Sequence, residues 1–388
     1  MRHWPGWRGP DRSGRAAWLP DRLPKSLNEC LVWSLPLPTD GLGGIAAAEG
    51  FVIVGGRDIE DQQDVFLFLD AESGFLLGQV SYPALGSLDY GNAPRATPLI
   101  TPTHAYLFGA FGHTTCVDLA AMETVWQRDL SRDYQTPELE WGLAGSPLLV
   151  DDLLIVQPGG RLGNLIALES ATGKTRWTSE GGKPGHTSCI LVEVAGRHQL
   201  VGYDATSLGG WDLATGERLW TITPPTRGDF NVPTPIWDQQ GQALIVSTEN
   251  NGTRRYTWSA NGQLQPDPVA QFEDLSPDSH SPVLSAGRVY GVCNGLHAIE
   301  AATLKPIWID ENEHLYDYAS LIVSGKRLLV LSVDGHLRLI EDAGETFRVL
   351  GELSLSKESV DVLSHPALAG TRLFVRLGRR IVCLELGK

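Results

Sequence analysis

Ala167 to Trp177, ALESATGKTRW, is the stretch of sequence that decides the fold. It predicts a strand, a tight turn around Thr172-Gly173 and a second strand that ends in a buried tryptophan. The pattern returns as CVDLAAMETVW (116–126), GWDLATGERLW (210–220) and AIEAATLKPIW (298–308). The copies lie about 43 to 51 residues apart, or about twice that, and this period predicts a β-propeller with one four-stranded blade per repeat.

The motif residues have a structural role in this interpretation. The turn glycine adopts a positive φ, and the acid eight positions before the tryptophan accepts backbone hydrogen bonds around the turn. The tryptophan fills the wedge between neighbouring blades. The residues assigned to this role are Asp118, Glu169, Asp212 and Glu300, with Trp126, Trp177, Trp220 and Trp308, and Trp33 at the same position of a partial copy.

The remaining repeats complete an all-β, eight-bladed propeller. We expect seven blades at 45–80, 96–130, 145–179, 187–222, 233–272, 281–310 and 319–353. Residues 364–386 supply only three strands of an eighth. Residues 29–35 supply the fourth, so pairing of 29–35 with 381–386 would close the ring and remove two exposed sheet edges. Seven blades are the alternative if 233–272, which lacks the motif acid and tryptophan, is only a long excursion.

Residues 1–28 are rich in proline, arginine, tryptophan and glycine and show no periodicity. They predict an irregular N-terminal arm, followed by a single propeller domain at 29–388. Trp4, Trp7 and Trp18 need burial, so we expect the arm to pack on the propeller.

Charge and cysteine usage limit the classes of partner. The net charge is −15, and the basic residues form no dense cluster beyond Arg254-Arg255 and the group Arg376, Arg379 and Arg380, so nucleic acid is not expected as a partner. We interpret the acidity as a source of solubility. The five cysteines are scattered and never in CxxC spacing, which predicts neither a zinc site nor a disulfide framework.

No apolar run is long enough to span a membrane, and the N-terminus lacks the apolar core of a signal peptide. The sequence as written therefore predicts a cytoplasmic protein, or a periplasmic or cell-envelope protein if an export signal has been removed. We expect a monomer.

The repeats, of the form A-x-[DE]-x-x-[TA]-G-[KE]-x-x-W, resemble the tryptophan-docking motif of the eight-bladed pyrroloquinoline-quinone (PQQ) propellers. That superfamily includes quinoprotein alcohol dehydrogenases and the non-enzymatic outer-membrane-protein assembly lipoprotein. WPGWRGPDRSG (4–14), FNVPTPIW (230–237), YASLIVSGKRLLVLSVDGHL (318–337) and HPALAGTRLFVRLGRRIVCLEL (365–386) also resemble bacterial PQQ-like repeat proteins.

The resemblance implies the fold, but the chain departs from the dehydrogenases. Those enzymes use two adjacent cysteines as a disulfide over the quinone, and no two cysteines are adjacent here. They also hold Ca²⁺ with Glu, Asn and Asp side chains and use an Asp base, a set that matches no numbered positions in this chain. We therefore carry over neither PQQ nor calcium ligands and assign no catalytic residue.

Connectors between blades and loops between second and third strands share one face of a propeller, which forms the mouth of the axial channel. Polar and aromatic residues there are candidates for a pocket that binds a ligand or partner. At least four of them should lie in one cavity if the hypothesis holds. They are Tyr90, Asn92, Arg95, Trp141, His186, Asn231, His280, Asp317, Tyr318 and His365. The wide spacing of the three histidines does not support a metal site.

We expect a non-catalytic, rigid platform that binds a protein, peptide or carbohydrate through its loop face. No cofactor is expected under this hypothesis. The alternative is a quinoprotein dehydrogenase-like oxidoreductase that uses PQQ with Ca²⁺ at an axial funnel. Arg95 for the quinone carboxylates and Asp317 for the metal are its nearest candidates.

Overall fold

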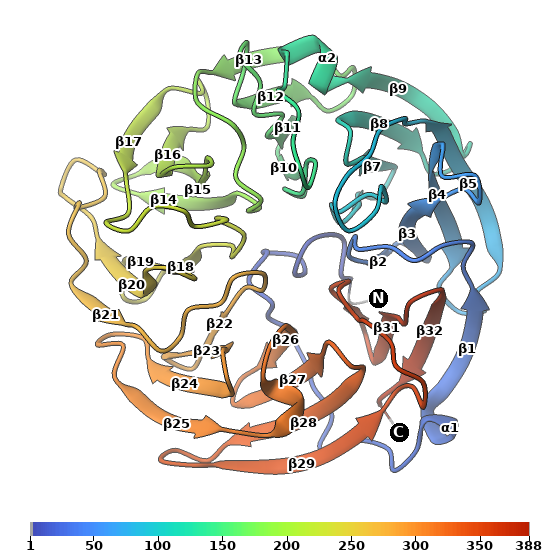
Figure 1. The fold of residues 1–388 in the computed structure, drawn as a ribbon, viewed down its shortest axis with the longest axis vertical. Helices are drawn as coiled ribbons and strands as arrows, with labels where there is room; N and C mark the ends of the chain where they lie inside the picture. The colour runs from blue at the N-terminus through green and yellow to red at the C-terminus, as the bar shows by residue number, and fades with distance from the viewer. Residues whose placement is uncertain (1–2, 388) are drawn as a thin grey trace.

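The computed structural model describes residues 3–387 as eight four-stranded antiparallel sheets arranged in a ring (Figure 1). The all-β, eight-bladed propeller is confirmed, and the divergent segment 233–272 is a complete blade. The helical elements in the described residues are short: α1 (Leu27–Cys30), α2 (Leu130–Tyr134) and the 3₁₀-helix η1 (Glu313–Leu315). No helix in this part of the chain is long and apolar enough to cross a membrane.

The strands of each blade follow the chain from the axis outward. The first four blades are β2 (Ala46–Ala48), β3 (Phe51–Arg57), β4 (Gln63–Asp70) and β5 (Leu76–Pro83); β6 (Leu99–Ile100), β7 (His104–Phe108), β8 (His113–Asp118) and β9 (Glu123–Asp129); β10 (Leu148–Val150), β11 (Leu153–Val156), β12 (Leu165–Glu169) and β13 (Thr175–Ser179); and β14 (Ile190–Val194), β15 (Arg197–Tyr203), β16 (Leu208–Asp212) and β17 (Arg218–Ile222).

The next three blades are β18 (Ile236–Asp238), β19 (Ala243–Thr248), β20 (Gly252–Thr257) and β21 (Ala270–Phe272); β22 (Val283–Ser285), β23 (Arg288–Val292), β24 (Leu296–Glu300) and β25 (Pro306–Asp310); and β26 (Ala319–Ser324), β27 (Arg327–Ser332), β28 (His336–Asp342) and β29 (Phe347–Ser354). The eighth blade combines β30 (Ala367–Ala369), β31 (Arg372–Arg376) and β32 (Arg380–Glu385) with β1 (Leu31–Pro36) as its outermost strand.

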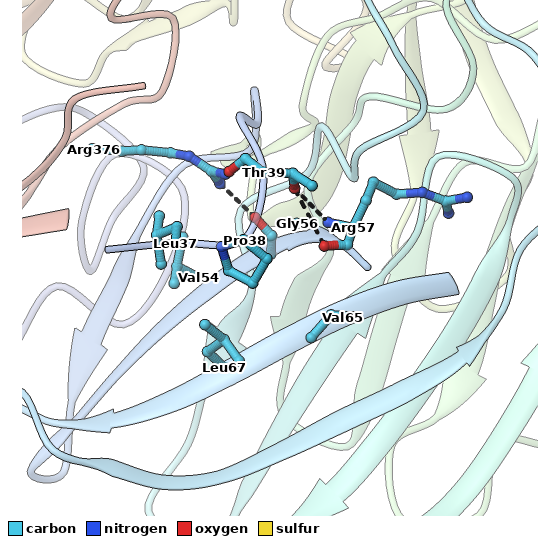
Figure 2. A pocket seen from close by; sticks show the side chains of 10 residues that line it. Leu37, Pro38, Thr39, Val54, Gly56, Arg57, Val65, Leu67 and Arg376 are labelled. Carbon is cyan, nitrogen blue, oxygen red and sulfur yellow. Dashed lines mark hydrogen bonds between the residues drawn. The ribbon is translucent and has the colours of Figure 1, made fainter. Parts of the chain in front are cut away.

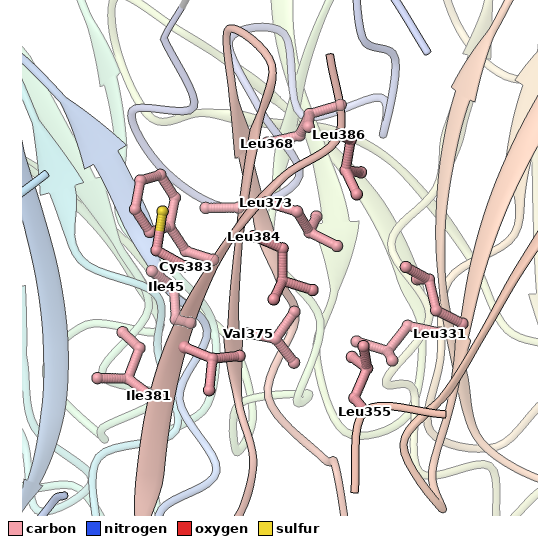
Figure 3. Packing of buried hydrophobic residues seen from close by; sticks show 14 of the residues in the cluster. Ile45, Leu331, Leu355, Leu368, Leu373, Val375, Ile381, Cys383, Leu384 and Leu386 are labelled. Carbon is pink, nitrogen blue, oxygen red and sulfur yellow. The ribbon is translucent and has the colours of Figure 1, made fainter. Parts of the chain in front are cut away.

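The ring closes as predicted, because β1 pairs antiparallel with β32, with Trp33 opposite Cys383. The closing strand begins two residues later than expected, since residues 27–30 form α1. Figure 3 shows the core of this blade, where Ile45 of blade 1 packs on one side and Leu331 of blade 7 on the other. The two ends of the chain are thus held in one apolar cluster.

Motif tryptophans lie against the turn of the following blade. Trp177 of blade 3 donates from Nε1 to the carbonyl of Leu213 in blade 4, at 3.0 Å. A Cβ on Gly216 would lie 2.4 Å from the Trp177 ring, so only glycine allows this contact. The same arrangement joins Trp33 to Ala71 and Gly74, and Trp126 to Ser170 and Gly173.

Two motif tryptophans pack differently because of the blade that follows them. Blade 5 lacks the motif, and Trp220 packs edge-on against Trp258 at 5.6 Å while donating to Gln199 Oε1 of its own blade. Trp308 lies 5.0 Å from the ring of Phe347. Aromatic contacts here replace the glycine contact.

The motif acids accept hydrogen bonds within their own turns. Asp118 Oδ1 accepts from the backbone amides of Ala120 and Ala121, both at 2.8 Å, and Asp212 accepts from two amides in the same way. Glu169 and Glu300 are the other two motif acids. Their longer side chains accept from the hydroxyls of Thr172 and Thr303 instead of from backbone amides.

Replacing Gly216 with alanine should destabilise the protein more than an ordinary glycine substitution. Left-handed φ costs a non-glycine residue ~1–2 kcal/mol, and displacement of the Trp177 ring adds ~1–3 kcal/mol. Gly196→Ala is the matched control, because Gly196 also has a positive φ but has open space around its Cβ position. Urea denaturation of the two variants measures the difference, and equal losses would contradict the docking role of Gly216.

Candidate functional site

One face of the ring carries the longest loops. Since the four strands of each blade are antiparallel, the loop after the second strand and the connector after the fourth lie at the same end. We call this end the connector face. It consists of residues 37–45, 58–62, 84–98, 109–112, 130–147, 157–164, 180–189, 204–207, 223–235, 249–251, 273–282, 293–295, 311–318, 333–335, 355–366 and 377–379. All ten candidate residues lie on it.

Trp141 brings several connectors together. Its ring lies 5.4 Å from that of His186 and 5.1 Å from that of Phe230. Its Nε1 donates to Asp89 Oδ2 at 3.4 Å. Burial, and then the charge of Arg95, lowers the pKa of His186. Connectors from the first five blades therefore meet in one mixed aromatic and charged surface.

Arg95 forms its hydrogen bonds within its own connector. Its guanidinium donates to the carbonyls of Ala93 at 2.5 Å, Gly91 at 2.7 Å and Asp89 at 2.8 Å. Burial lowers the pKa of Arg95 to about 10, so the group stays charged at neutral pH. Its role in the structure is to fold the connector between blades 1 and 2.

The first connector also holds Tyr90 and Asn92. Tyr90 is exposed and has a left-handed backbone with φ 59°. Asn92 donates from Nδ2 to Asp61 Oδ2 at 2.6 Å and accepts from the Leu88 amide. Asn92 thereby links the connector to the acidic loop at 58–62.

His280 and Asp317 line a second cavity of ≈ 210 Å³, with Glu249, Cys293 and Tyr316 among its other residues. His280 Nε2 accepts from the Val292 amide at 3.0 Å. Burial lowers the pKa of His280 to about 4, so the imidazole is neutral.

The side chains of the other three candidates, Tyr318, Asn231 and His365, contact other parts of the fold. Tyr318 donates to the Leu363 carbonyl at 3.0 Å, and its ring lies 6.2 Å from that of His280. Asn231 is buried and donates to the Asp204 carbonyl. His365 is buried against the arm, where Trp4 stacks on it and Trp7 lies 5.2 Å from its ring. Burial lowers the pKa of His365 to about 3.

The candidates are therefore distributed around the mouth rather than in one cavity: Arg95, Trp141 and His186 share one neighbourhood, His280, Asp317 and Tyr318 another. The three histidines have separate surroundings. Within residues 3–387, no group of three His, Cys, Asp or Glu side chains is placed to hold a metal ion.

The N-terminal arm occupies the axis of the ring, and Figure 1 shows it crossing the middle. Trp7 Nε1 donates to Thr234 Oγ1 of blade 5 at 3.0 Å, while its ring contacts His365 of blade 8. Arg12 donates to carbonyls before blade 3, and Trp4 forms a β-bridge with Ala47 of blade 1. The arm thus joins blades on opposite sides of the channel.

The residues nominated for a PQQ and Ca²⁺ site do not form one. Arg95 bonds to its own connector between blades 1 and 2, whereas Asp317 lies between blades 6 and 7. Trp4, Trp7 and Arg8 of the arm lie at the axis between them. A PQQ site needs an arginine for the quinone carboxylates close to the acids that hold the metal, and Arg95 and Asp317 are not close in this way.

One feature of the mouth was not expected from the sequence. The Thr97 backbone amide donates to Ser146 Oγ at 3.0 Å, and the Ser146 backbone amide donates to Ser188 Oγ at 2.9 Å, so each bond links the backbone before one inner strand to the hydroxyl before the next. Thr234 donates to Ser281 Oγ in the same way. An [ST]-Pro dipeptide marks four of these five positions, Thr97-Pro98, Ser146-Pro147, Thr234-Pro235 and Ser281-Pro282, whereas Ser188 is followed by Cys189.

A small cavity of ≈ 10 Å³ lies at the seam between blade 8 and blade 1 (Figure 2). Arg376 is buried there and donates to the carbonyls of Gly55 at 2.5 Å and Thr39 at 2.8 Å. Thr39 Oγ1 accepts from the Arg57 amide. The space holds about one water. The hydrogen bonds of Arg376 therefore join blade 8 to blade 1 at a seam that is too small for a ligand.

The family model of outer membrane protein assembly factor BamB matches residues 61–310. The chain belongs to this family. The predicted membership of the PQQ-like propellers is confirmed by this match. Among curated proteins, the sequence has no significant match.

Solved structures of BamB and of quinohemoproteins share the fold. BamB from Moraxella catarrhalis is 16% identical, with a TM-score of 0.62, and the alignment covers 92% of this chain and 99% of that one. Quinohemoprotein alcohol dehydrogenase from Comamonas testosteroni is 12% identical, with a TM-score of 0.65, covering 100% of this chain and 81% of that one. At these identities the likeness shows the architecture alone.

Proposed function

We propose that this BamB-family propeller is a non-catalytic platform that binds a basic, partly apolar protein or peptide segment on its connector face. The observation that carries the proposal is the coincidence of negative charge and exposed apolar side chains on that face. Proteins dock through such mixed surfaces, in which charge steers the encounter and apolar anchors supply affinity.

The negative charge of the chain is concentrated on the connector face. Its loops hold 21 of the 46 acidic residues but only 7 of the 31 basic residues, a net of −14 against −15 for the whole chain. Charge serving solubility alone would be spread over the surface. A one-sided field attracts a positively charged partner.

Large apolar side chains are exposed on the same loops. They are Ile59, Leu85, Tyr90, Leu162, Phe230 and Tyr316, each between 45% and 81% exposed. The half-buried Trp141 lies among them and contacts Phe230. Single exposed apolar residues are common on proteins, and nine others lie elsewhere on this chain, but these six stand beside the negative charge of the same face, which favours an interaction surface there.

Two cavities on this face are suited to anchoring side chains. One, of ≈ 240 Å³, is lined by connectors of blades 1 to 3 and includes Leu88, Phe111 and Leu139. The other is the cavity of ≈ 210 Å³ with Asp278 and Asp317 at its lining. The first suits an apolar side chain and the second a lysine or arginine.

A random twelve-residue peptide library displayed on phage tests the proposal. Peptides selected on the immobilised protein should be rich in Lys and Arg with at least one large apolar residue, and their affinity should fall with added salt. Asp278→Asn combined with Asp317→Asn should weaken a selected peptide about tenfold, measured by calorimetry, which is ~1.4 kcal/mol.

Asp151→Asn combined with Asp152→Asn is the matched control. It removes the same charge from an exposed turn between β10 and β11, on the opposite face. The control should bind within twofold of the parent protein. Selected peptides without a basic excess, or equal losses in both double variants, would contradict binding at the connector face.

PQQ with Ca²⁺ should leave the thermal unfolding midpoint unchanged. A ligand at 100 times its Kd would add ~2.7 kcal/mol, which raises Tm by a few degrees in a chain of this size. We expect no saturable rise, because Arg95 and Asp317 do not converge and the arm lies at the axis. A saturable shift in differential scanning fluorimetry would favour the oxidoreductase alternative instead.

A further inference from the structure

A cavity beside the N-terminal arm lies on the face opposite the connectors. Its volume is ≈ 480 Å³, within the range of small-molecule pockets. It is bounded by the arm and by the inner strands of blades 4, 5 and 6. Its lining includes Arg8, Arg12 and Arg15 from the arm, Ile190 and Leu191 from β14, and Trp237 from β18.

Three arginines of the arm line this cavity, and their acceptors among the described residues are all backbone carbonyls. Arg8 Nη2 donates to the Pro282 carbonyl at 2.6 Å and to that of Ser13 at 3.3 Å. Arg12 donates to the carbonyls of Pro147 and Ser146 at 2.8 and 2.9 Å, and Arg15 donates to that of Leu284 at 2.8 Å. Within residues 3–387, none of the three forms a salt bridge.

The first two arginines are buried charges that lack a carboxylate partner. Arg8 is 2% exposed and Arg12 7% exposed, and the Nε atoms of both have no hydrogen-bond partner among the described residues. Burial lowers the pKa of each to about 10, so both carry a positive charge at neutral pH. A buried charge is costly unless an opposite charge compensates it.

The acids at the cavity compensate only part of this charge. Asp11 is exposed, and its Oδ1 accepts from the amide and hydroxyl of Ser13. Asp238 is already paired with Arg255, whose Nη1 donates to Asp238 Oδ2 at 2.9 Å. Counting the lining side chains and Arg255, the cavity keeps a net positive charge in a strongly acidic protein.

We propose that this cavity binds a small organic anion, with a carboxylate near the arm arginines and an apolar body against Ile190, Leu191 and Trp237. The site lies on the face opposite the connectors and is independent of the partner surface. The arginines then have two tasks: their carbonyl contacts hold the arm, and their charge holds the ligand.

The probe for this site is 2-naphthoate, with 2-naphthamide as its uncharged analogue. Calorimetry on the full chain should show saturable binding of the carboxylate, and the amide should bind at least about tenfold more weakly because it lacks the charge. Added salt should weaken 2-naphthoate and leave the amide unchanged.

Substitutions at two exposed lining residues, Gln240 and Arg15, locate the binding. Gln240 is exposed and lines the cavity, so Gln240→Glu should weaken 2-naphthoate about fivefold by repulsion. Arg15→Gln should weaken it to a similar degree. Gln271→Glu, on the outer strand β21, adds the same charge away from the cavity and should change nothing.

Saturable binding of 2-naphthoate that Gln240→Glu and Arg15→Gln weaken would support the site. The proposal is wrong if 2-naphthoate does not bind, if the amide binds as tightly, or if Gln271→Glu weakens binding as much as Gln240→Glu. The arginines would in that case serve only to hold the arm. None of these outcomes bears on partner binding at the connector face.

Discussion

Replacing Trp4 with alanine is expected to lower the free energy of unfolding by about 3–5 kcal/mol, the usual cost of removing a buried aromatic side chain. Trp4 is 1% exposed, although it lies only four residues from the start of the chain. It packs in the cluster that also holds Ile45 and the closing blade. Its backbone pairs with Ala47, and its ring stacks on His365.

The loss should appear in equilibrium urea or guanidinium denaturation. Tyr90→Ala is the control, since Tyr90 is an exposed aromatic residue of the connector face and its removal should cost less than ~0.5 kcal/mol. A Trp4→Ala variant as stable as the Tyr90→Ala variant would mean that the arm is not part of the folded core. The contacts of the arm at the axis would then contribute nothing measurable to the free energy of unfolding.

The second large effect is expected for Arg57→Leu, at about 3–5 kcal/mol near pH 8, because a buried ion pair loses one partner. Arg57 is 3% exposed and its Nη1 donates to Asp64 Oδ1 at 2.7 Å, while Asp64 is fully buried. Arg57 also donates to Asp61 and to the Ala84 carbonyl. The substitution leaves the Asp64 carboxylate without its cation in the core between blades 1 and 2.

The loss should depend on pH in a defined direction. Burial already raises the pKa of Asp64 to about 6, from an ordinary value of 3.8, although Arg57 opposes the shift. Between those values the native state binds a proton that the unfolded state does not, so the stability contributed by this group falls as pH rises. Without Arg57 the pKa rises further. Arg57→Leu should therefore cost most at pH 8 and least near pH 5.

The double variant Arg57→Leu with Asp64→Asn separates this cause from simple loss of packing. Removing the carboxylate as well should restore part of the stability at pH 8 and abolish the difference between pH 5 and pH 8. Denaturation curves at both pH values provide the comparison. A single variant whose loss is the same at both would contradict the buried-charge explanation.

The periodic part of the chain predicts most of the fold. A tryptophan, an acid and a turn glycine repeat because every blade meets its neighbour in the same way, so Trp177 reveals the position of Gly216 one blade later. The three strands at the C-terminus and the single strand around Trp33 predict the closure for the same reason. The bounds of several strands differ by one to three residues, and the closing strand begins two residues late because the short helix α1 takes its first residues.

The path of the arm could not be predicted from the sequence. Arg8 and Arg12 bond to backbone carbonyls of Pro282 and Pro147, and any residue offers such a carbonyl. Candidate side chains were placed on the correct face by strand topology, but their surroundings depend on how each connector folds. Arg95 turns back onto its own connector, and Trp4 and Trp7 cover His365.

The charge distribution was visible in the sequence but had been assigned to solubility. Acidic residues such as Asp58, Asp278 and Asp317 are far apart in the chain, and only the strand boundaries place them on one face. Once the residues are assigned to blades, the count of charged residues shows a negative connector face, whereas acidic and basic residues nearly balance in the rest of the chain. The position of these acids on one face therefore follows from the strand topology and not from their order in the sequence.

Hydrogen–deuterium exchange with a bound selected peptide tests the central claim, that partners dock on the connector face, most directly. The account predicts slower amide exchange in the connectors at 223–235, 273–282 and 311–318, with no change in the opposite-face turns at 151–152 and 239–242. Protection confined to those turns or to the outer strands β5 and β29, with the connectors unchanged, would contradict it.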